Sequence, residues 1–286
     1  MSCLASSVSA CGRRRAVNER RQHAVLTGLS LGVMTCFGGL LLCPHRAQCL
    51  TALTYADTWV SAGTRMALPL VVASLAVWLG RVVWLLSRAG ACTRALQISE
   101  DMPDALLASM TRTGLHRVVC LAADAPTAFC SGALRPRVLV SDGLVRRLSA
   151  EALDAVLLHE REHVRSLEPL VRAGLDSASE VFFYIPLLRW WSQHRLEESE
   201  LRADRVALDR LGPRPVAAAL WALGSSTAVR GAAAFGGVAR LRVAQVLGDP
   251  LPARAPGLSL IAISGMGTYF ALQAASCLVQ AAGRLI

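Results

Sequence analysis

The chain has 286 residues, of which 53% are hydrophobic and 17% charged, and its mean hydropathy is +0.43. These values exclude an ordinary soluble domain and are typical of a membrane protein with a polar domain attached. The net charge is +10, and all 30 basic residues are arginines. They are spread along the chain without a zinc-finger, homeodomain or RNP-type motif, so direct nucleic-acid binding is not expected. The nine cysteines form no C-x-x-C pair, which argues against a cysteine zinc site.

Three apolar runs are long enough to be membrane helices. Residues 1–23 are polar and basic, and residues 24–43 contain no charge, which covers about 30 Å of hydrocarbon at 1.5 Å per residue. A polar loop over 44–65 leads to a second apolar helix over 66–87. The third run, 257–283, is again uncharged. The sequence therefore predicts an integral membrane protein with about three transmembrane helices.

The arginines are distributed unevenly about these runs. They gather before the first run, after the second and before the third, and they are sparse on the opposite side. Positively charged residues favour the cytoplasmic side of a membrane. We therefore expect a cytoplasmic N-terminus at 1–23, two transmembrane helices with a short outer loop at 24–87, a cytoplasmic domain at 88–255, and a C-terminal transmembrane helix at 256–286.

The cytoplasmic domain is predicted to be α+β and mostly helical, with a small β-sheet. Short apolar runs bounded by turn residues indicate strands, and longer runs indicate helices. The expected elements are a helix over 96–111, strands over 117–122, 127–131 and 137–141, and a helix from 150 to about 165. Ser149 can cap the last of these helices, and Pro169 prevents its continuation.

The central motif is His159-Glu160-Arg161-Glu162-His163, which reads H-E-x-x-H within this last helix. Histidines four residues apart lie on one helical face, so both can bind one zinc ion. Glu160 projects about 100° round the helix, where it can reach a zinc-bound water rather than the metal.

A catalytic zinc needs a third protein ligand and an open position for water. The best source is the segment 197–204, which is helical in composition and is followed by Gly212-Pro213, a stop signal. Glu200 and Asp204 lie four apart on one face. Glu200 can bind zinc, and Asp204 can accept the free N–H of a ligating histidine. An E-x-x-x-D pair alone would more often be a solvated charged face.

The apolar, aromatic run 181–191 lies between the two predicted metal-binding segments and is shorter than a membrane span. It is either an interfacial hairpin or an ordinary core helix, and both interpretations stay open.

Several of these segments together resemble the BlaR/MecR-type integral membrane zinc metallopeptidases, which are membrane gluzincins, and more distantly the HtpX/Ste24 type. The resemblance covers about residues 115–210. It rests on AFCSG at 128–132, RPRVLVS at 135–141, LSAEALDAVLLHEREH at 148–163 and the later ELRAD at 200–204. Two positions depart from the family pattern, because Glu168 stands where Asp is usual and Ile185 where Asn often precedes the proline. Few residues follow the last apolar run, so direct β-lactam sensing is not expected.

The resemblance implies a zincin-like domain in which His159, His163 and Glu200 hold Zn²⁺. Glu160 would then take a proton from the zinc-bound water and deliver it to the leaving amine. A cationic or hydroxyl group should stabilise the oxyanion, and the candidates are Tyr184, His194 and Arg205. The strand near Phe129 could bind the substrate by backbone pairing, although Phe129 could equally be a core residue.

The function expected is that of a zinc metalloendopeptidase in the bacterial inner membrane, with its active site facing the cytoplasm. Its substrate would be a protein or peptide, and regulated proteolysis would involve a cytoplasmic repressor of the BlaI/MecI winged-helix type. One alternative is membrane-protein quality control of the HtpX kind. Another is a non-enzymatic membrane sensor with a structural zinc, against which Glu160 argues because a structural site needs no base.

Overall fold

The computed structural model describes the backbone of residues 56–227, 232–252 and 254–283, and the side chains of 71–224, 238–252 and 254–272. The predicted membrane helix over 24–43 lies outside the described residues. The chain divides into two compact units, Met1–Leu70 and Val71–Ile286. All elements below belong to the second unit, except that the first helix begins within the first.

The second and third apolar runs both form helices, α3 (Ala56–Arg94) and α11 (Leu258–Gly283). The expected loop over 44–65 is wrong from Ala56 onward, because the segment contains no residue that stops a helix and tolerates its one glycine, Gly63. Within the described residues, Val71–Arg94 is long and apolar enough to cross a membrane, whereas Leu258–Leu272 is apolar but shorter. The structure thus gives one candidate span.

Helix α4 (Asp104–Thr113) starts later than predicted. The expected helix over 96–111 is wrong at its beginning, because Pro103 disfavours helical geometry in the residues that precede it. Residues 97–99 instead run alongside a strand. Ser99 donates its N–H to the carbonyl of Cys120 over 3.0 Å, and Ala122 donates to the carbonyl of Gln97 over 3.1 Å.

The three predicted strands are confirmed as β1 (Val118–Leu121), β2 (Ala128–Ser131) and β3 (Arg137–Ser141). The sheet has the order β1-β3-β2, in which β1 is parallel and β2 antiparallel to β3. Residues 97–99 cover the outer edge of β1. The outer edge of β2 has no neighbouring strand in the described part of the chain.

Helix α6 (Ala150–Arg165) confirms the predicted helix and its cap. Ser149 accepts a hydrogen bond from the N–H of Ala152 over 3.3 Å. The N-terminal part of α6 is apolar and packs with the sheet, and Leu153, Leu157 and β3 residue Val138 are almost wholly buried. The short helix α5 (Asp142–Arg147) connects β3 to α6. Gly143 is required there, because a Cβ at this position would collide with the backbone of Asp124.

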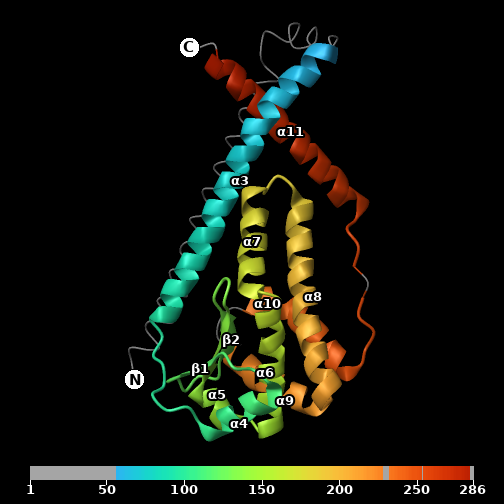
Figure 1. Ribbon diagram of the computed structural model, residues 1–286. Coiled ribbons are helices and arrows are strands. Elements are labelled where there is room, and N and C mark those ends of the chain that lie inside the picture. Colours follow the sequence, from blue (N-terminus) through green and yellow to red (C-terminus); the bar gives the residue numbers. More distant parts are fainter. Residues whose placement is uncertain (1–55, 228–231, 253, 284–286) are drawn as a thin grey trace. The chain divides into compact units, whose positions relative to one another are not determined.

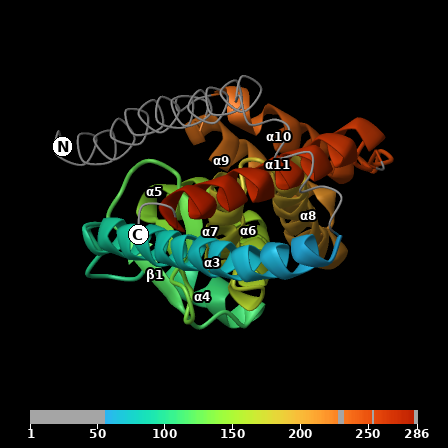
Figure 2. The same cartoon turned by 90° about the horizontal axis from the view of Figure 1, so that it is seen from above.

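Four helices surround α6 or extend beyond it: α7 (Glu168–Val181), α8 (Pro186–Leu211), α9 (Pro213–Thr227) and α10 (Ala232–Leu247). Helices α7 and α8 form an antiparallel hairpin, which Figure 1 shows from the side and Figure 2 from above. The predicted run 181–191 is divided between the end of α7, a short turn and the start of α8. The described chain is therefore mostly helical with one small sheet, as expected.

Candidate metal centre

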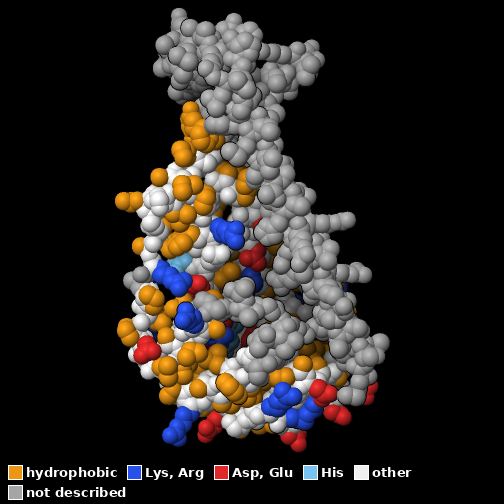
Figure 3. Space-filling view, turned by 180° about the vertical axis from the view of Figure 1, so that it is seen from behind, with side chains coloured by type: hydrophobic (Ala, Val, Ile, Leu, Met, Phe, Trp, Pro, Cys, Tyr) orange, Lys and Arg blue, Asp and Glu red, His pale blue; other side chains and the backbone are white. Residues whose placement is uncertain are grey.

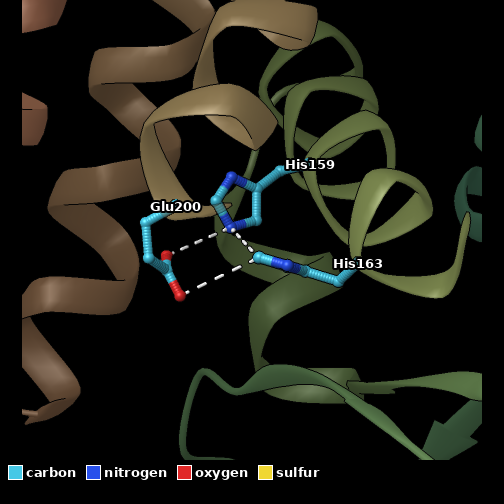
Figure 4. A group of neighbouring side chains, drawn as sticks. All are labelled: His159, His163 and Glu200. Atoms are coloured by element: carbon cyan, nitrogen blue, oxygen red, sulfur yellow. Dashed lines mark hydrogen bonds and ion pairs between the residues drawn. The ribbon is translucent and has the colours of Figure 1, made fainter. Parts of the chain in front are cut away.

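Helices α6 and α8 bring three ionisable side chains to one point (Figure 4). The Nε2 atoms of His159 and His163 face each other at 3.0 Å. The Glu200 carboxylate lies 3.6 Å from Nε2 of His159 and 3.9 Å from Nε2 of His163. One potential ligand atom from each residue lies within 4.8 Å of the others.

These separations suit a zinc ion. Zinc binds histidine nitrogen at 2.0–2.1 Å and carboxylate oxygen at similar distance, so ligand atoms at the corners of a tetrahedron lie about 3.3 Å apart. The measured separations of 3.0, 3.6 and 3.9 Å bracket this value. Two imidazoles and one carboxylate are also the ligand set of a catalytic zinc that keeps one position open. The residues present therefore fit the metal that the sequence predicts.

Asp204 fixes the orientation of His159. Its Oδ1 lies 2.8 Å from Nδ1 of His159, which leaves Nε2 directed toward Glu200. Asp204 is only 1% exposed. Its carboxylate also accepts two hydrogen bonds from Arg242 on α10, at 2.6 and 2.7 Å. Arg242 thus positions Asp204, which in turn positions His159.

Glu160 lies between the histidines in sequence and is only 7% exposed. Burial raises its pKa to about 7, and the charge of Glu200 adds to this shift while His159 opposes it. A carboxyl group with a pKa near neutrality can both accept and donate a proton at physiological pH. Glu160 therefore has the properties of a general acid–base group.

The two histidines titrate very differently in the metal-free protein. Burial acts to lower the pKa of His159, but hydrogen bonds with Asp204 and Glu200 outweigh burial and raise this pKa to about 9. For His163, burial lowers the pKa to about 4, and the charge of His159 acts in the same direction. Burial would raise the pKa of Glu200, yet His159 and Arg242 keep it well below its ordinary value. At neutral pH one histidine is charged and the other neutral.

Two arginines flank Glu200 and differ in exposure. Arg242 places Nη1 at 3.2 Å from Oε2 of Glu200, with its side chain 21% exposed. Arg172 on α7 places Nη2 at 3.6 Å from Oε1 of Glu200 and 3.6 Å from Oε1 of Glu168, with its side chain 48% exposed. Glu168 is buried and accepts a hydrogen bond from Ser199 over 2.7 Å, which joins α7 to α8 beside the centre.

None of the described contacts of the three suggested oxyanion stabilisers involves a potential zinc ligand, and their role stays a prediction. Tyr184 lies at the end of the α7–α8 hairpin, with its ring 5.6 Å from that of Phe183. His194 stacks on Trp190 at 5.1 Å. Arg205 is exposed and lines a surface cavity beside α10. Among the described interactions, none joins these residues to the potential zinc ligands.

The sequence reasoning missed Arg172 and Arg242. Arg242 entered it only as one of several positive charges that indicate the cytoplasmic side of the membrane. Nothing local distinguishes either residue, because the chain contains 30 arginines. Arg242 and Asp204 are 38 residues apart in the sequence, so their contact follows from helix packing and not from a motif.

A protein-family model described as BlaR1 peptidase M56 matches residues 50–217. The match covers more than half of the chain and includes α6, α7 and α8, with Glu160, the three potential ligands and Asp204. Arg242 lies beyond the matched range. No curated protein matches the chain.

Removing a potential ligand should remove the metal. The purified protein is expected to bind about one zinc per chain, and His159→Ala, His163→Ala and Glu200→Ala should each abolish binding. Asp204→Ala should weaken binding by about 10–100-fold, because it only orients a ligand. Metal content after dialysis and competition with a chelating indicator would measure both effects. Full occupancy in Glu200→Ala would remove Glu200 from the ligand set.

Zinc affinity should rise with pH, and of the two histidine ligands only His159 should release a proton. Below its pKa of about 9 the metal-free His159 carries a proton that zinc must displace, whereas His163, with a pKa of about 4, is already neutral. Affinity should therefore increase about tenfold per pH unit from pH 6 and level off near pH 9, corresponding to release of one ligand proton. Competition titrations across this range would measure the slope. Asp204→Asn, which removes the main interaction raising the pKa, should level off at lower pH. A slope of two protons in Glu160→Gln, which removes the other group that titrates in this range, would contradict the assignment.

Proposed function

The chain belongs to the BlaR1 peptidase M56 family, and from that premise we propose that it is a membrane-bound zinc endopeptidase with His159, His163 and Glu200 as its metal ligands. The observation that carries the proposal is the meeting of these three side chains beside the buried carboxyl group of Glu160. A structural zinc site would be closed by four ligands and would have no use for a base at this position.

When bound, zinc supplies Lewis-acid polarisation of a carbonyl oxygen and activation of water. The remaining steps fall to the protein. Glu160 takes the proton of the attacking water and passes it to the leaving amine, for which a pKa of about 7 is well suited. Asp204 keeps His159 in the tautomer that directs Nε2 toward Glu200, and Arg242 neutralises and orients Asp204.

Arg172 is the cation best placed to meet a substrate. It approaches Glu200 from the exposed side of the centre, and no contact shorter than 3.6 Å holds its guanidinium to the neighbouring carboxylates. We assign it the stabilisation of the negative charge that develops on the carbonyl oxygen. Arg242 is mostly buried and bonds to Asp204 through Nε and Nη2, while its Nη1 lies beside Glu200, which leaves it the role of a positioning residue.

Strand β2 offers a place for the substrate backbone. The N–H of Ser141 bonds the carbonyl of Thr127 at 2.9 Å. Because bonded and non-bonded pairs alternate along an antiparallel ladder, Ala128 and Cys130 direct their peptide groups away from β3, to the open edge. Glu160 is close enough to help raise the pKa of the Cys130 thiol, after burial, to about 12. A peptide added as a strand here would therefore pass beside Glu160.

The family favours a role in regulated proteolysis over general quality control. We propose that the substrate pathway includes a cytoplasmic repressor of the BlaI/MecI winged-helix type, that residues 24–43, 66–87 and 257–283 span the membrane, and that residues 88–255 face the cytoplasm. HtpX-like degradation of damaged membrane proteins is the competing function. A winged-helix repressor encoded beside the gene would support the first.

The Glu160→Gln variant distinguishes a peptidase from a non-enzymatic sensor with a structural zinc. The substitution keeps the size of the side chain but cannot accept a proton, so zinc and fold should be retained while hydrolysis falls at least 10²–10⁴-fold, roughly the contribution of a general base. Cleavage of a co-expressed winged-helix repressor and of an unfolded casein-like protein would be followed on gels, with a chelator as control. If the variant cleaves as fast as the parent, the mechanism is wrong. If the parent protein cleaves neither substrate while a partner protein still responds through it, the alternative of a non-enzymatic sensor with a structural zinc is favoured.

Arg172→Gln and Arg242→Gln form a matched pair of variants. Arg172→Gln should leave zinc affinity unchanged and lower kcat by about 10²–10³-fold, as removal of an oxyanion donor does. Arg242→Gln should weaken zinc binding by about 10–100-fold, because Asp204 loses its partner. Chelator competition and steady-state kinetics at saturating zinc would be measured for both. Equal loss of zinc in the two variants would show that Arg172 merely supports Glu200.

A further inference from the structure

The end of the α7–α8 hairpin is apolar and poorly buried. Residues 181–191 carry one charge, that of Arg189, and all of them are at least partly exposed. Phe183 is 43% and Trp191 46% exposed. Aromatic side chains left this open need a partner, because a contiguous exposed apolar patch in a soluble protein is unusual.

The neighbours of this hairpin end are the two apolar helices. Trp78 on α3 donates its indole N–H to the carbonyl of Gly174 over 3.0 Å. Arg81 on α3 forms an ion pair with Glu180 near the end of α7. On the other side, a Cβ added to Gly267 of α11 would collide with the carbonyl oxygen of Tyr184. The hairpin end therefore contacts both α3 and α11.

Both apolar helices expose hydrophobic side chains next to the hairpin. On α3 these include Val72 and Val77, which are 56% and 57% exposed, and on α11 they include Met266 and Tyr269, each 56% exposed. In the view of Figure 3, hydrophobic side chains predominate over the upper part of the described surface, and the acidic and basic side chains lie over its middle and lower parts.

Several backbone N–H groups of the turn and of the start of α8 have hydrogen-bond partners within the protein, as groups placed in lipid require. The N–H of Ile185 bonds the carbonyl of Phe182, and the N–H of Leu188 bonds that of Ile185, both at 2.9 Å. Pro186 has no N–H to satisfy. The N–H of Leu187 donates to Oγ of Ser264 on α11 over 2.9 Å. The start of α8, normally a site of unsatisfied donors, is thus closed by α11.

We propose that the end of the α7–α8 hairpin, from Phe182 to Leu188, enters the hydrocarbon of the bilayer beside α3 and α11. The ion pair between Arg81 and Glu180 neutralises both charges at the point of entry. The guanidinium group of Arg189 reaches back to the lipid phosphates, and Trp190 and Trp191 occupy the membrane interface. The domain that carries the metal centre is therefore not merely tethered to the membrane but inserted in it.

The insertion fixes the height of the metal centre above the membrane. Glu200 lies on the same helix as Trp191, about 14 Å further along the axis at 1.5 Å per residue. The peptide bonds within reach are thus those of segments held close to the cytoplasmic surface of the bilayer. This consequence rests on the proposed peptidase function, but the lipid contact itself does not.

Photocrosslinking tests the lipid contact directly. Benzoylphenylalanine would be placed singly at Phe183, at Val77 of α3 and at Leu134, which is 76% exposed in the β2–β3 turn. The full-length protein, reconstituted in phosphatidylcholine and phosphatidylglycerol vesicles, would be irradiated and analysed by mass spectrometry. We expect lipid adducts at 183 and 77 and none at 134.

Each other outcome overturns the proposal at a defined point. Adducts at 77 without adducts at 183 would show that α3 spans the membrane while the hairpin stays in water. Absence of lipid adducts at both positions would overturn the membrane assignment as well. Crosslinks from 183 to polypeptide would identify a protein partner in place of lipid.

A second pair of variants tests how α11 holds the hairpin. Gly267→Val places side-chain atoms against Tyr184, whereas Gly265→Val meets nothing within 4 Å. Loss of the lipid adduct at 183 in Gly267→Val alone is expected. Equal adducts in both variants would show that α11 does not position the hairpin end. Neither residue belongs to the metal centre, so zinc binding in both variants serves as the control for folding.

Discussion

Ionisable side chains enclosed between α6, α7, α8 and α10 impose the strongest constraint on this structure. Asp204 is 1%, His163 5% and Glu160 7% exposed, and an uncompensated charge at such a depth costs several kcal/mol. The charge of Asp204 therefore requires partners, and they come from two other helices. Asp204 on α8 meets His159 on α6 and Arg242 on α10. The relative positions of these helices are set by this pairing as much as by hydrophobic contact.

Helix α6 also packs against the sheet through its N-terminal part. Up to Leu158 its inward face is apolar and forms the core with β3, where Val138 and Val140 are fully buried. From His159 onward the same face is ionisable. Because one rigid helix carries both parts, packing of the core against the sheet fixes the distance between the histidines and strand β2. The proposed substrate strand and the proposed metal ligands are thereby held in register without a flexible connection.

The α7–α8 hairpin links the metal centre to the apolar helices. At its base, Glu168 accepts a hydrogen bond from Ser199 and so holds α7 against α8 beside Glu200. At its far end the hairpin contacts α3 through Glu180 and α11 through Leu187. A shift of α8 at its N-terminal end would be transmitted to Glu200 because both lie on one uninterrupted helix.

The sequence alone determined the features that depend on neighbouring residues. The H-E-x-x-H spacing put two histidines on one face of α6, Ser149 capped that helix, and the three short strands had the predicted positions. Glu200 was chosen from its spacing to Asp204, and the structure places it beside the histidines; its role as a ligand stays a prediction. Tyr184, His194 and Arg205 are predicted from chemical type alone, and no described interaction joins them to the potential ligands. The starts of α3 and α4 were misjudged, since a loop over Ala56 and a helix across Pro103 were assumed. Only the tertiary structure brought Arg172 and Arg242 to the metal centre, because pairing between buried charges depends on how helices distant in sequence pack, and among 30 arginines no local pattern marks the two that are used.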